Sequence, residues 1–333
     1  MKFGTVPLSE AEGAILSHSL AGATRRLRKG VTLTADDIAE LAGAGHSEIT
    51  VARLEPGDLH EDAAAERFAA ALVPDPEAAR LRLAKPFTGR VNIYATQNGV
   101  AEIDEASIHR ANAVDPMISV ATVAPWARMR EGGMVATVKI ISYAVPEKAL
   151  RQAALQSIAA LRLRPPAYTT ASLIVTETTP GQAEGEQKGV EAIRARLSAL
   201  DVELIEVIPA AHETQAIAGA LRAATGESLF ILTASATSDP RDVAPEGLRQ
   251  AGGQVERFGM PVDPGNLLFL GALSGRPVVG LPGCVRSPVL NGADWVMERL
   301  LCGVPVSSAD IARMGVGGLL KEIPSRPQPR ERK

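Results

Sequence analysis

The stretch that decides the fold runs from residue 171 to residue 238, where short apolar segments alternate with helical ones. Its apolar segments are ASLIVTE (171–177), VELIEVIPA (202–210) and SLFILTASATS (228–238); its helical segments are EGEQKGVEAIRARLSAL (184–200) and HETQAIAGALRAA (212–224). Short apolar runs rich in Val and Ile are typical of buried strands. Their alternation with helices predicts an α/β domain with a mainly parallel sheet and helices on both faces.

The same pattern continues toward the C-terminus. APEGLRQAG (244–252) predicts a helix, and LLFLGAL (267–273) followed by Ser274-Gly275 and RPVVGLPG (276–283) predicts a hairpin. SPVLNGADWVMERLL (287–301) predicts the last helix, with Ser287 as its N-cap and Pro288 as its first residue. We expect the ending RPQPRERK (326–333) to be a frayed tail.

Upstream of residue 167 the rhythm differs, and the sequence predicts an α+β accessory region over residues 1–166. ADDIAELAGAG (35–45) predicts a short helix with Thr34 as its N-cap. Residues 84–147 are β-rich, and residues 148–163 predict a closing amphipathic helix. RVNIYATQ (90–97) and VAEI (100–103) flank Asn98-Gly99, which predicts a hairpin. The predicted organisation is an accessory region (1–166), an α/β domain (167–304) and a C-terminal extension and tail (305–333).

Composition restricts the class of protein. The chain has 333 residues, a hydrophobic fraction of 46%, a charged fraction of 22% and a net charge of −3. These values are ordinary for a globular protein and give no basic footprint for nucleic acid or for an anionic membrane. With two cysteines and neither a secretory signal nor a membrane span in the sequence, we expect a cytoplasmic protein.

Three polar loops follow predicted strands, where open α/β sheets bind their ligands. Hydroxyl groups and glycines in such loops, next to helix N-termini with free amide groups, form a cradle for an anion. A solvated turn is the alternative for any single loop. The candidate binding residues are Thr176 in the first loop; Thr233, Ser235, Thr237, Ser238 and Arg241 in the second; and Pro282, Gly283 and Ser287 in the third.

These loops resemble those of the molybdenum-cofactor biosynthesis (molybdopterin-binding) domain, which the molybdotransferase and adenylyltransferase branches share. TASATSDPRD (233–242) stands in register with the family's Thr-Gly-Gly-Thr/Ser-Gly motif, which polar residues and Asp follow. Pro264-Gly265-Asn266 mirrors the family's Pro-Gly-Lys, and Gly280-Leu281-Pro282-Gly283 mirrors its Gly-Leu-Pro-Gly. The resemblance spans about residues 171–303, and the first half resembles accessory regions of the molybdotransferase branch more loosely.

The resemblance implies molybdopterin as ligand or substrate, Gly265 as a further binding residue and Asp242 as the acidic catalytic residue, with Mg²⁺ as a possible companion. It also implies partners: a nucleotidyltransferase or molybdoenzyme downstream, and a second copy of the chain in a homo-oligomer. The chain departs from the motif where Ala234 and Ser235 replace both glycines and where Pro-Gly-Lys has lost its Lys. These departures favour retained binding over retained catalysis.

Three functions therefore stay open at this point. The leading one is a molybdopterin-binding protein that acts as a molybdotransferase or as a pterin carrier. The alternatives are a non-catalytic scaffold that kept the fold, and an enzyme acting on another phosphorylated nucleotide. The sequence predicts no metal site, because His60-Glu61-Asp62 point in different directions on a helix; a capping pair of Asp58 and Glu61 is favoured there.

Overall fold

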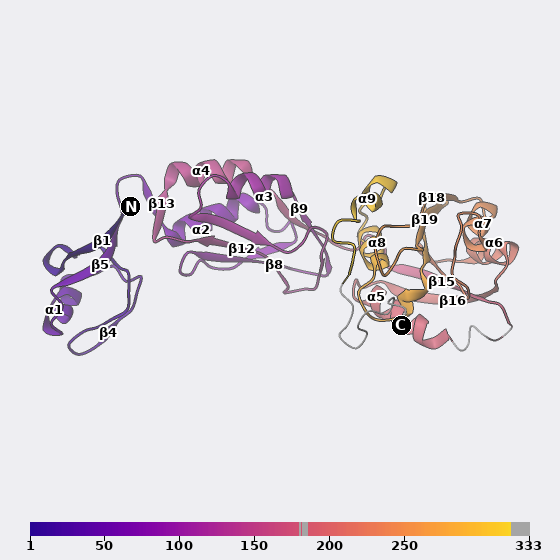
Figure 1. The fold of residues 1–333 in the computed structure, drawn as a ribbon, viewed down its shortest axis with the longest axis horizontal. Helices are drawn as coiled ribbons and strands as arrows, with labels where there is room; N and C mark the ends of the chain where they lie inside the picture. The colour runs from indigo at the N-terminus through magenta and orange to yellow at the C-terminus, as the bar shows by residue number, and fades with distance from the viewer. Residues whose placement is uncertain (180, 182–185, 321–333) are drawn as a thin grey trace, which may run out of the picture. The chain divides into compact units, whose positions relative to one another are not determined.

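The chain divides into two units in a computed structural model that describes residues 1–179, 181 and 186–320 (Figure 1). Unit 1 comprises residues 1–96, 101–125 and 131–163. Unit 2 comprises residues 97–100, 126–130 and the chain from Arg164 onward. Two short pieces of unit 2 are thus encoded within the sequence of unit 1. The predicted tail at 326–333 lies outside the described residues.

The first half of the chain begins with a small layer of strands and one helix. The pairing order is β1-β5-β2, and α1 starts with a capping box in which the Thr34 hydroxyl accepts from the Asp37 amide. This matches the predicted helix after Thr34. The elements here are β1 (Lys2–Pro7), η1 (Leu8–Glu10), β2 (Ile15–Leu16), β3 (Leu20–Ala21), β4 (Arg26–Leu27), α1 (Ala35–Gly43) and β5 (Glu48–Arg53).

A second sheet of unit 1 has the order β10-β12-β8-β7. The predicted hairpin over residues 90–103 is wrong, because β8 pairs on one edge with β12 and on the other with β7. With both edges taken, β9 pairs instead in the order β11-β9-β14. The elements of unit 1 here are β7 (Leu81–Leu83), β8 (Arg90–Ala95), α3 (Glu105–Asn112), β10 (Ile118–Thr122) and β12 (Met134–Ile140). Strand β11 (Arg128–Met129) and the first residues of β9 (Gly99–Ile103) belong to the two short segments of unit 2.

The predicted closing helix over residues 148–163 is too long. Helix α4 spans Glu147–Gln156, and Ala159 adopts a left-handed φ of 55° before strand β14 (Leu161–Arg164) begins. The alternation of buried Leu161 and Leu163 with exposed Arg162 has the period of a strand. The helical pattern therefore stops where the period changes from 3.6 to 2.

Helix α2 (Glu61–Leu72) starts differently from the prediction. Its N-cap is His60, whose Nδ1 accepts from the Asp62 amide at 3.3 Å. Asp58 is instead paired with the N-terminal ammonium of Met1 at 2.6 Å. The predicted Asp58–Glu61 capping pair is wrong, because a stronger, charged partner takes the Asp58 carboxylate. The neighbouring strands are β6 (Asp58–His60) and β13 (Ala144–Pro146), which pair antiparallel.

Unit 2 is built on a sheet of mixed orientation with the strand order β16-β15-β17-β20-β19-β18. The pairings from β16 to β20 are parallel, whereas β19 runs antiparallel to both of its neighbours. The elements are β15 (Thr170–Glu177), α5 (Gln187–Ser198), β16 (Glu203–Ala211), α6 (Thr214–Ala223), β17 (Ser228–Leu232), α7 (Val243–Gln250), β18 (Gln254–Phe258), β19 (Phe269–Leu273), β20 (Arg276–Leu281), η3 (Gly283–Arg286), α8 (Gly292–Leu301) and α9 (Ser308–Arg313).

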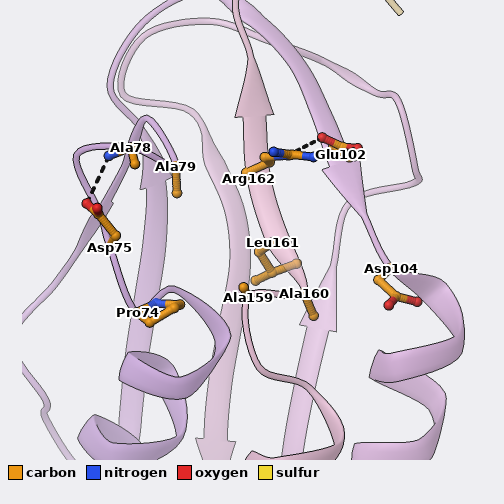
Figure 2. Close-up of a pocket in the computed structure, with 10 residues that line it drawn as sticks. All are labelled: Pro74, Asp75, Ala78, Ala79, Glu102, Asp104, Ala159, Ala160, Leu161 and Arg162. Atoms are coloured by element: carbon orange, nitrogen blue, oxygen red, sulfur yellow. Dashed lines mark hydrogen bonds and ion pairs between the residues drawn. The ribbon is translucent and has the colours of Figure 1, made fainter. Parts of the chain in front are cut away.

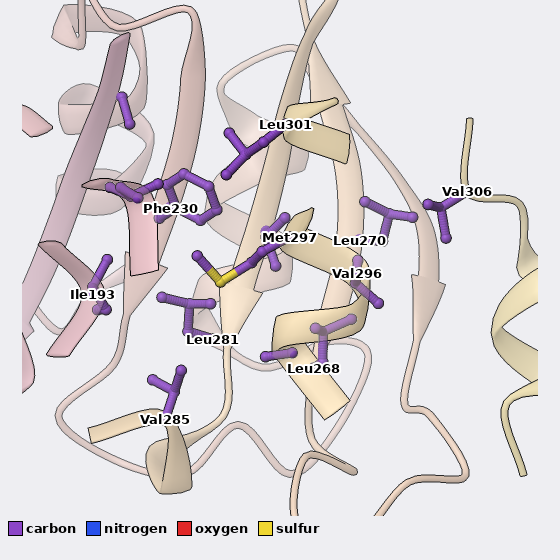
Figure 3. Close-up of a cluster of buried hydrophobic side chains, with 14 of the residues drawn as sticks. Ile193, Phe230, Leu268, Leu270, Leu281, Val285, Val296, Met297, Leu301 and Val306 are labelled. Atoms are coloured by element: carbon purple, nitrogen blue, oxygen red, sulfur yellow. The ribbon is translucent and has the colours of Figure 1, made fainter. Parts of the chain in front are cut away.

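Successive strand residues of this sheet belong to two different cores. Leu173 and Leu232 lie in the core that α5 and α8 cover, and Figure 3 shows Ile193 of α5, Phe230 of β17 and Met297 of α8 within it. Ile174 and Ile231 lie in the core that α6 and α7 cover. Helices α6 and α7 lie side by side (Figure 1). Because side chains alternate across a strand, the two cores occupy opposite faces of the sheet.

The hairpin from β19 to β20 is confirmed. Ser274 and Gly275 have φ angles of 51° and 80°, the left-handed values that a tight type I′ turn requires. Across the hairpin, Phe269 stands opposite Gly280. A side chain at residue 280 would meet the Phe269 ring, with Cβ only 1.9 Å from its Cε1. The ring therefore occupies the space that the glycine leaves.

Candidate functional site

The parallel strands of unit 2 end level with one another, so the loops that follow them meet at one edge. Val175 pairs with Leu232, and Leu232 pairs with Leu281. On the other side of β15, Thr176 pairs with Ala210. This edge is the place where open α/β sheets bind ligands. The first predicted loop runs from Thr176 to Gly181, and Pro180 within it lies outside the described residues.

Thr176 joins the first loop to its neighbours. Its side chain is buried, and its hydroxyl lies 2.9 Å from Nδ1 of His212, just after β16. The same Oγ1 accepts the amide of Ala234, just after β17, at 2.8 Å. Thr176 thus ties three strand ends together, and the hydroxyl that the sequence suggested for ligand binding is used within the protein.

The second loop presents some of its predicted residues to solvent and buries others. Thr233 and Thr237 are buried, while Ser235, Ser238 and Arg241 are exposed. The carbonyl of Thr233 accepts from the Arg286 guanidinium at 2.9 Å, which links this loop to the third. The exposed hydroxyls and Arg241 remain the groups of this loop that a ligand can reach.

Asp242, the predicted acidic residue, is the N-cap of α7. One carboxylate oxygen accepts the Val243 amide at 2.7 Å and the other accepts the Ser238 amide at 2.9 Å. Both oxygens thus stabilise the backbone at the loop's exit. Asp242 shapes the second loop through these two bonds.

The third loop differs from its prediction. After the 3-10 turn η3, Ser287 is the C-cap of that turn, and α8 does not begin until Gly292. The N-cap of α8 is Asn291, in a capping box with Asp294. Because that box satisfies the first amide groups of the helix, it defines a start later than Ser287 and Pro288. The prediction of Ser287 as N-cap is therefore wrong.

Pro282 and Gly283 lead into η3, with Pro282 buried and Gly283 exposed. Gly265, the remaining predicted residue, has a φ of 137°, and a Cβ there would come within 2.8 Å of the Gly292 amide nitrogen. The Gly292 amide donates to the Pro264 carbonyl at 2.8 Å. Gly265 therefore permits close packing against the start of α8.

Arg196 of α5 organises the third loop and is not among the site residues predicted from the sequence. Its guanidinium donates to the carbonyls of Val285 at 3.0 Å and Ser287 at 2.8 Å. It also forms an ion pair with Asp294, and both side chains are largely buried. A signal existed in the sequence: Arg196 lies three residues after Ile193 and one before Leu197, on the helix face that enters the core.

A buried carboxylate lies close to this ion pair. Glu298 of α8 forms an ion pair with Arg128 at 3.0 Å, yet burial raises the pKa of Glu298 to about 7, and the charge of Asp294 adds to the rise. The charges of Arg128 and Arg196 act in the opposite direction. Burial also raises the pKa of Cys302 to about 12, so this thiol stays protonated.

The raised pKa of Glu298 predicts a stability that falls as pH increases. The folded protein holds a proton on Glu298 that the unfolded chain, with a pKa near 4.5, has released. This stabilisation is complete below the unfolded pKa and is lost as pH rises through about 7. Relative to Glu298→Gln, the wild-type free energy of unfolding should fall by roughly 3 kcal/mol at most across this window. Urea unfolding of both proteins at several pH values measures this difference. The prediction would be contradicted if the free energies of unfolding of the two proteins changed with pH in parallel.

A separate cavity lies in unit 1 (Figure 2). It has a volume of about 420 Å³, and its charged groups are already engaged. Glu102 pairs with Arg162, and Asp104 caps α3 by accepting from the amide and the hydroxyl of Ser107. Asp75 accepts the Ala78 amide at 3.0 Å. The strand-end loops of unit 2 are therefore the stronger candidate site.

The described part of the chain, residues 1–179, 181 and 186–320, lacks both a metal-ligating cluster and a membrane-spanning helix. No group of three or more His, Cys, Asp or Glu side chains in that part is arranged to hold a metal ion. No helix there is long and apolar enough to span a bilayer.

Comparisons with known proteins give limited matches. The model of a domain of unknown function (DUF8806) matches residues 5–53. No curated protein matches the chain. A solved molybdopterin biosynthesis MoeA protein from Pyrococcus horikoshii is 14% identical with a TM-score of 0.32, covering 91% of this chain and 75% of that one. The molybdopterin biosynthesis enzyme MoaB from Thermus thermophilus is 19% identical with a TM-score of 0.28, covering 41% and 98%. Because these TM-scores are low, the two structures carry no argument about the function of this chain.

Proposed function

We propose that the strand-end loops of unit 2 bind molybdopterin or its nucleotide form through an oxyanion, and that the chain acts in molybdenum-cofactor assembly as a pterin carrier. One observation carries the proposal: the described ends of β15, β16, β17 and β20 are joined by hydrogen bonds at one edge of the sheet. Thr176 bonds to His212 and to Ala234. Arg286 bonds to Thr233. Residues that are already held by such bonds bind a ligand without the entropic cost of ordering them.

The chemistry of this edge supports an anionic ligand. Arg286 supplies a guanidinium, which suits carboxylate and phosphate oxygens. Ser235 and Ser238 expose hydroxyl donors, and Arg241 adds a second cation nearby in sequence. The motif order from residue 233 to residue 283, which resembles the molybdopterin-binding domain, narrows the anion to a pterin phosphate.

The role of Asp242 favours a carrier over a transferase. Both of its carboxylate oxygens accept backbone amides, so they stabilise the loop and the start of α7. An acid that organises phosphoryl transfer through Mg²⁺ instead directs an oxygen at the ion. We therefore propose that the chain presents the pterin to a nucleotidyltransferase or molybdoenzyme.

The test is calorimetric titration of the full chain with molybdopterin. We expect binding in the micromolar range, weakened at least roughly tenfold by Ser235→Trp because the larger side chain fills the exposed loop. Ser198→Trp is the matched control. Ser198 is the exposed last residue of α5, at the other end of this helix from the strand-end loops, so the same substitution there should leave binding unchanged. Asp242→Ala should also weaken binding, since the loop loses two hydrogen bonds.

Other outcomes distinguish the alternatives. Failure of the wild-type chain to bind molybdopterin would rule out both carrier and transferase. Tighter binding of nucleoside phosphates than of molybdopterin would favour an enzyme of another phosphorylated nucleotide. Molybdate-dependent turnover of bound molybdopterin would make the chain a transferase and overturn the carrier proposal.

A further inference from the structure

Among the described residues, the carboxylate that pairs with the Arg286 guanidinium is that of Glu186. Its Nε donates to Oε1 of Glu186 at 2.6 Å, and its Nη2 donates to the Thr233 carbonyl at 2.9 Å. The contact of Nη1 with the Gly283 carbonyl is long, at 3.4 Å. The Arg286 and Glu186 side chains are 30% and 24% exposed, so the pair lies at the surface of the strand-end edge.

The ion pair fits beside α5 because residue 189 is a glycine. A Cβ on Gly189, in the first turn of α5, would lie 2.4 Å from Oε1 of Glu186 and 3.3 Å from Cγ of Arg286. A side chain at residue 189 would therefore displace the carboxylate. The glycine permits Glu186 to lie over the start of α5 and to reach Arg286.

The start of α5 also favours an anion at this place. Within residues 186–198, Glu186 takes the N-cap position, yet its side chain accepts no capping hydrogen bond, and the first turn holds no acidic residue. A helix start of this kind attracts negative charge through its amide groups. The Glu186 carboxylate that pairs with Arg286 thus lies beside the first turn of α5.

We propose that Glu186 is an internal latch: its carboxylate occupies the anion position on Arg286, and a phosphate oxyanion of the ligand displaces it. The inference rests on the proposed function and names its anion contact. A guanidinium pairs with carboxylate and phosphate through the same fork of N–H groups, so one can replace the other. Because the pair is partly exposed, opening it costs little.

The Thr233 carbonyl holds Arg286 in place while phosphate replaces the Glu186 carboxylate. When Glu186 leaves, the hydrogen bond from Nη2 to this carbonyl still orients Arg286 toward the strand ends. A phosphate carries more negative charge than a carboxylate and therefore gains more from the guanidinium and from the α5 amides. The latch thus keeps the site closed to weak anions such as carboxylates and opens it to phosphate.

The experiment compares Glu186→Gln with the wild-type full chain, using inorganic phosphate and molybdopterin as separate probes. Removing the competing carboxylate should tighten the binding of both probes about fivefold, as the loss of a partly exposed ion pair implies. Glu191→Gln is the matched control, because Glu191 is an exposed acid of the same helix paired with Arg194. Arg286→Lys should weaken both probes, since an ammonium cannot form the fork.

The binding affinities of the variants test the latch and the carrier function separately. Equal phosphate affinity in Glu186→Gln and Glu191→Gln would overturn the latch, and it would leave the carrier function intact if molybdopterin still binds. Weaker binding in Glu186→Gln would also overturn it, by making Glu186 a ligand contact. Tighter phosphate binding in Glu186→Gln without any molybdopterin binding would support the latch and reject the pterin as ligand. Circular dichroism of each variant confirms that it is folded.

Discussion

Replacing Arg196 by Met is expected to lower the free energy of unfolding by about 3 to 5 kcal/mol, because it leaves the largely buried Asp294 carboxylate without its cation. The loss extends to the third loop, whose Val285 and Ser287 carbonyls lose their donor. Met keeps most of the volume and the helix propensity of the original side chain. The effect is therefore that of the missing guanidinium.

Chemical denaturation measures this loss, and Arg194→Met is its control on the same helix. Arg194 forms an exposed ion pair with Glu191, so its replacement should cost about 0 to 1 kcal/mol. Adding Asp294→Asn to Arg196→Met should restore part of the stability, because the amide keeps a capping oxygen and removes the unpaired charge. A cost for Arg196→Met no larger than that of the control would show that the ion pair does not organise the loop.

Gly280→Ala should lower the free energy of unfolding by about 1 to 3 kcal/mol, since the added methyl group meets the Phe269 ring in a closely packed core. The new Cβ would lie 1.9 Å from Cε1 and 2.1 Å from Cδ1 of that ring. Phe269 is fully buried and cannot move without disturbing its neighbours on α6 and α7. The same substitution at Gly219, on the exposed face of α6 with open space around it, should stabilise by about 1 kcal/mol.

Opposite signs for one substitution at two glycines are the result to look for. A double variant, Gly280→Ala with Phe269→Leu, separates ring contact from backbone effects. If the ring is responsible, the two changes together cost less than the sum of each alone. Additive costs, or a stable Gly280→Ala protein, would mean that the hairpin relaxes around the new side chain.

Local signals in the sequence predicted the elements whose structure depends on neighbours in the chain. The capped helix after Thr34 and the tight hairpin at Ser274-Gly275 formed as expected, since their capping and turn residues act within a few positions. The Asn98-Gly99 hairpin did not form, although its turn signal is equally strong. Pairing of β8 with β7 and β12 is a long-range competition that turn residues do not encode.

The candidate site shows the same division. The sequence placed hydroxyl-rich loops at the strand ends, and the parallel pairing brings those ends level. It did not reveal that the side chains of Thr176 and Asp242 accept hydrogen bonds from backbone amides, or that Arg196 and Arg286 link the loops. The bonds of Asp242 are local, but those of Thr176, Arg196 and Arg286 join residues that lie tens of positions apart, up to 100 between Glu186 and Arg286. No local pattern marks these long-range bonds.

The interleaving of the two units bears on how the chain folds during synthesis. Val100 lies in the unit 2 core, Trp126 packs against that core, and Arg128 pairs with Glu298. The ribosome therefore releases these pieces long before the rest of unit 2 exists. Folding of domains from the N-terminus onward is the usual order during translation. Here the segments 97–100 and 126–130 must wait for α8, so unit 2 is completed only after the ribosome has released that helix.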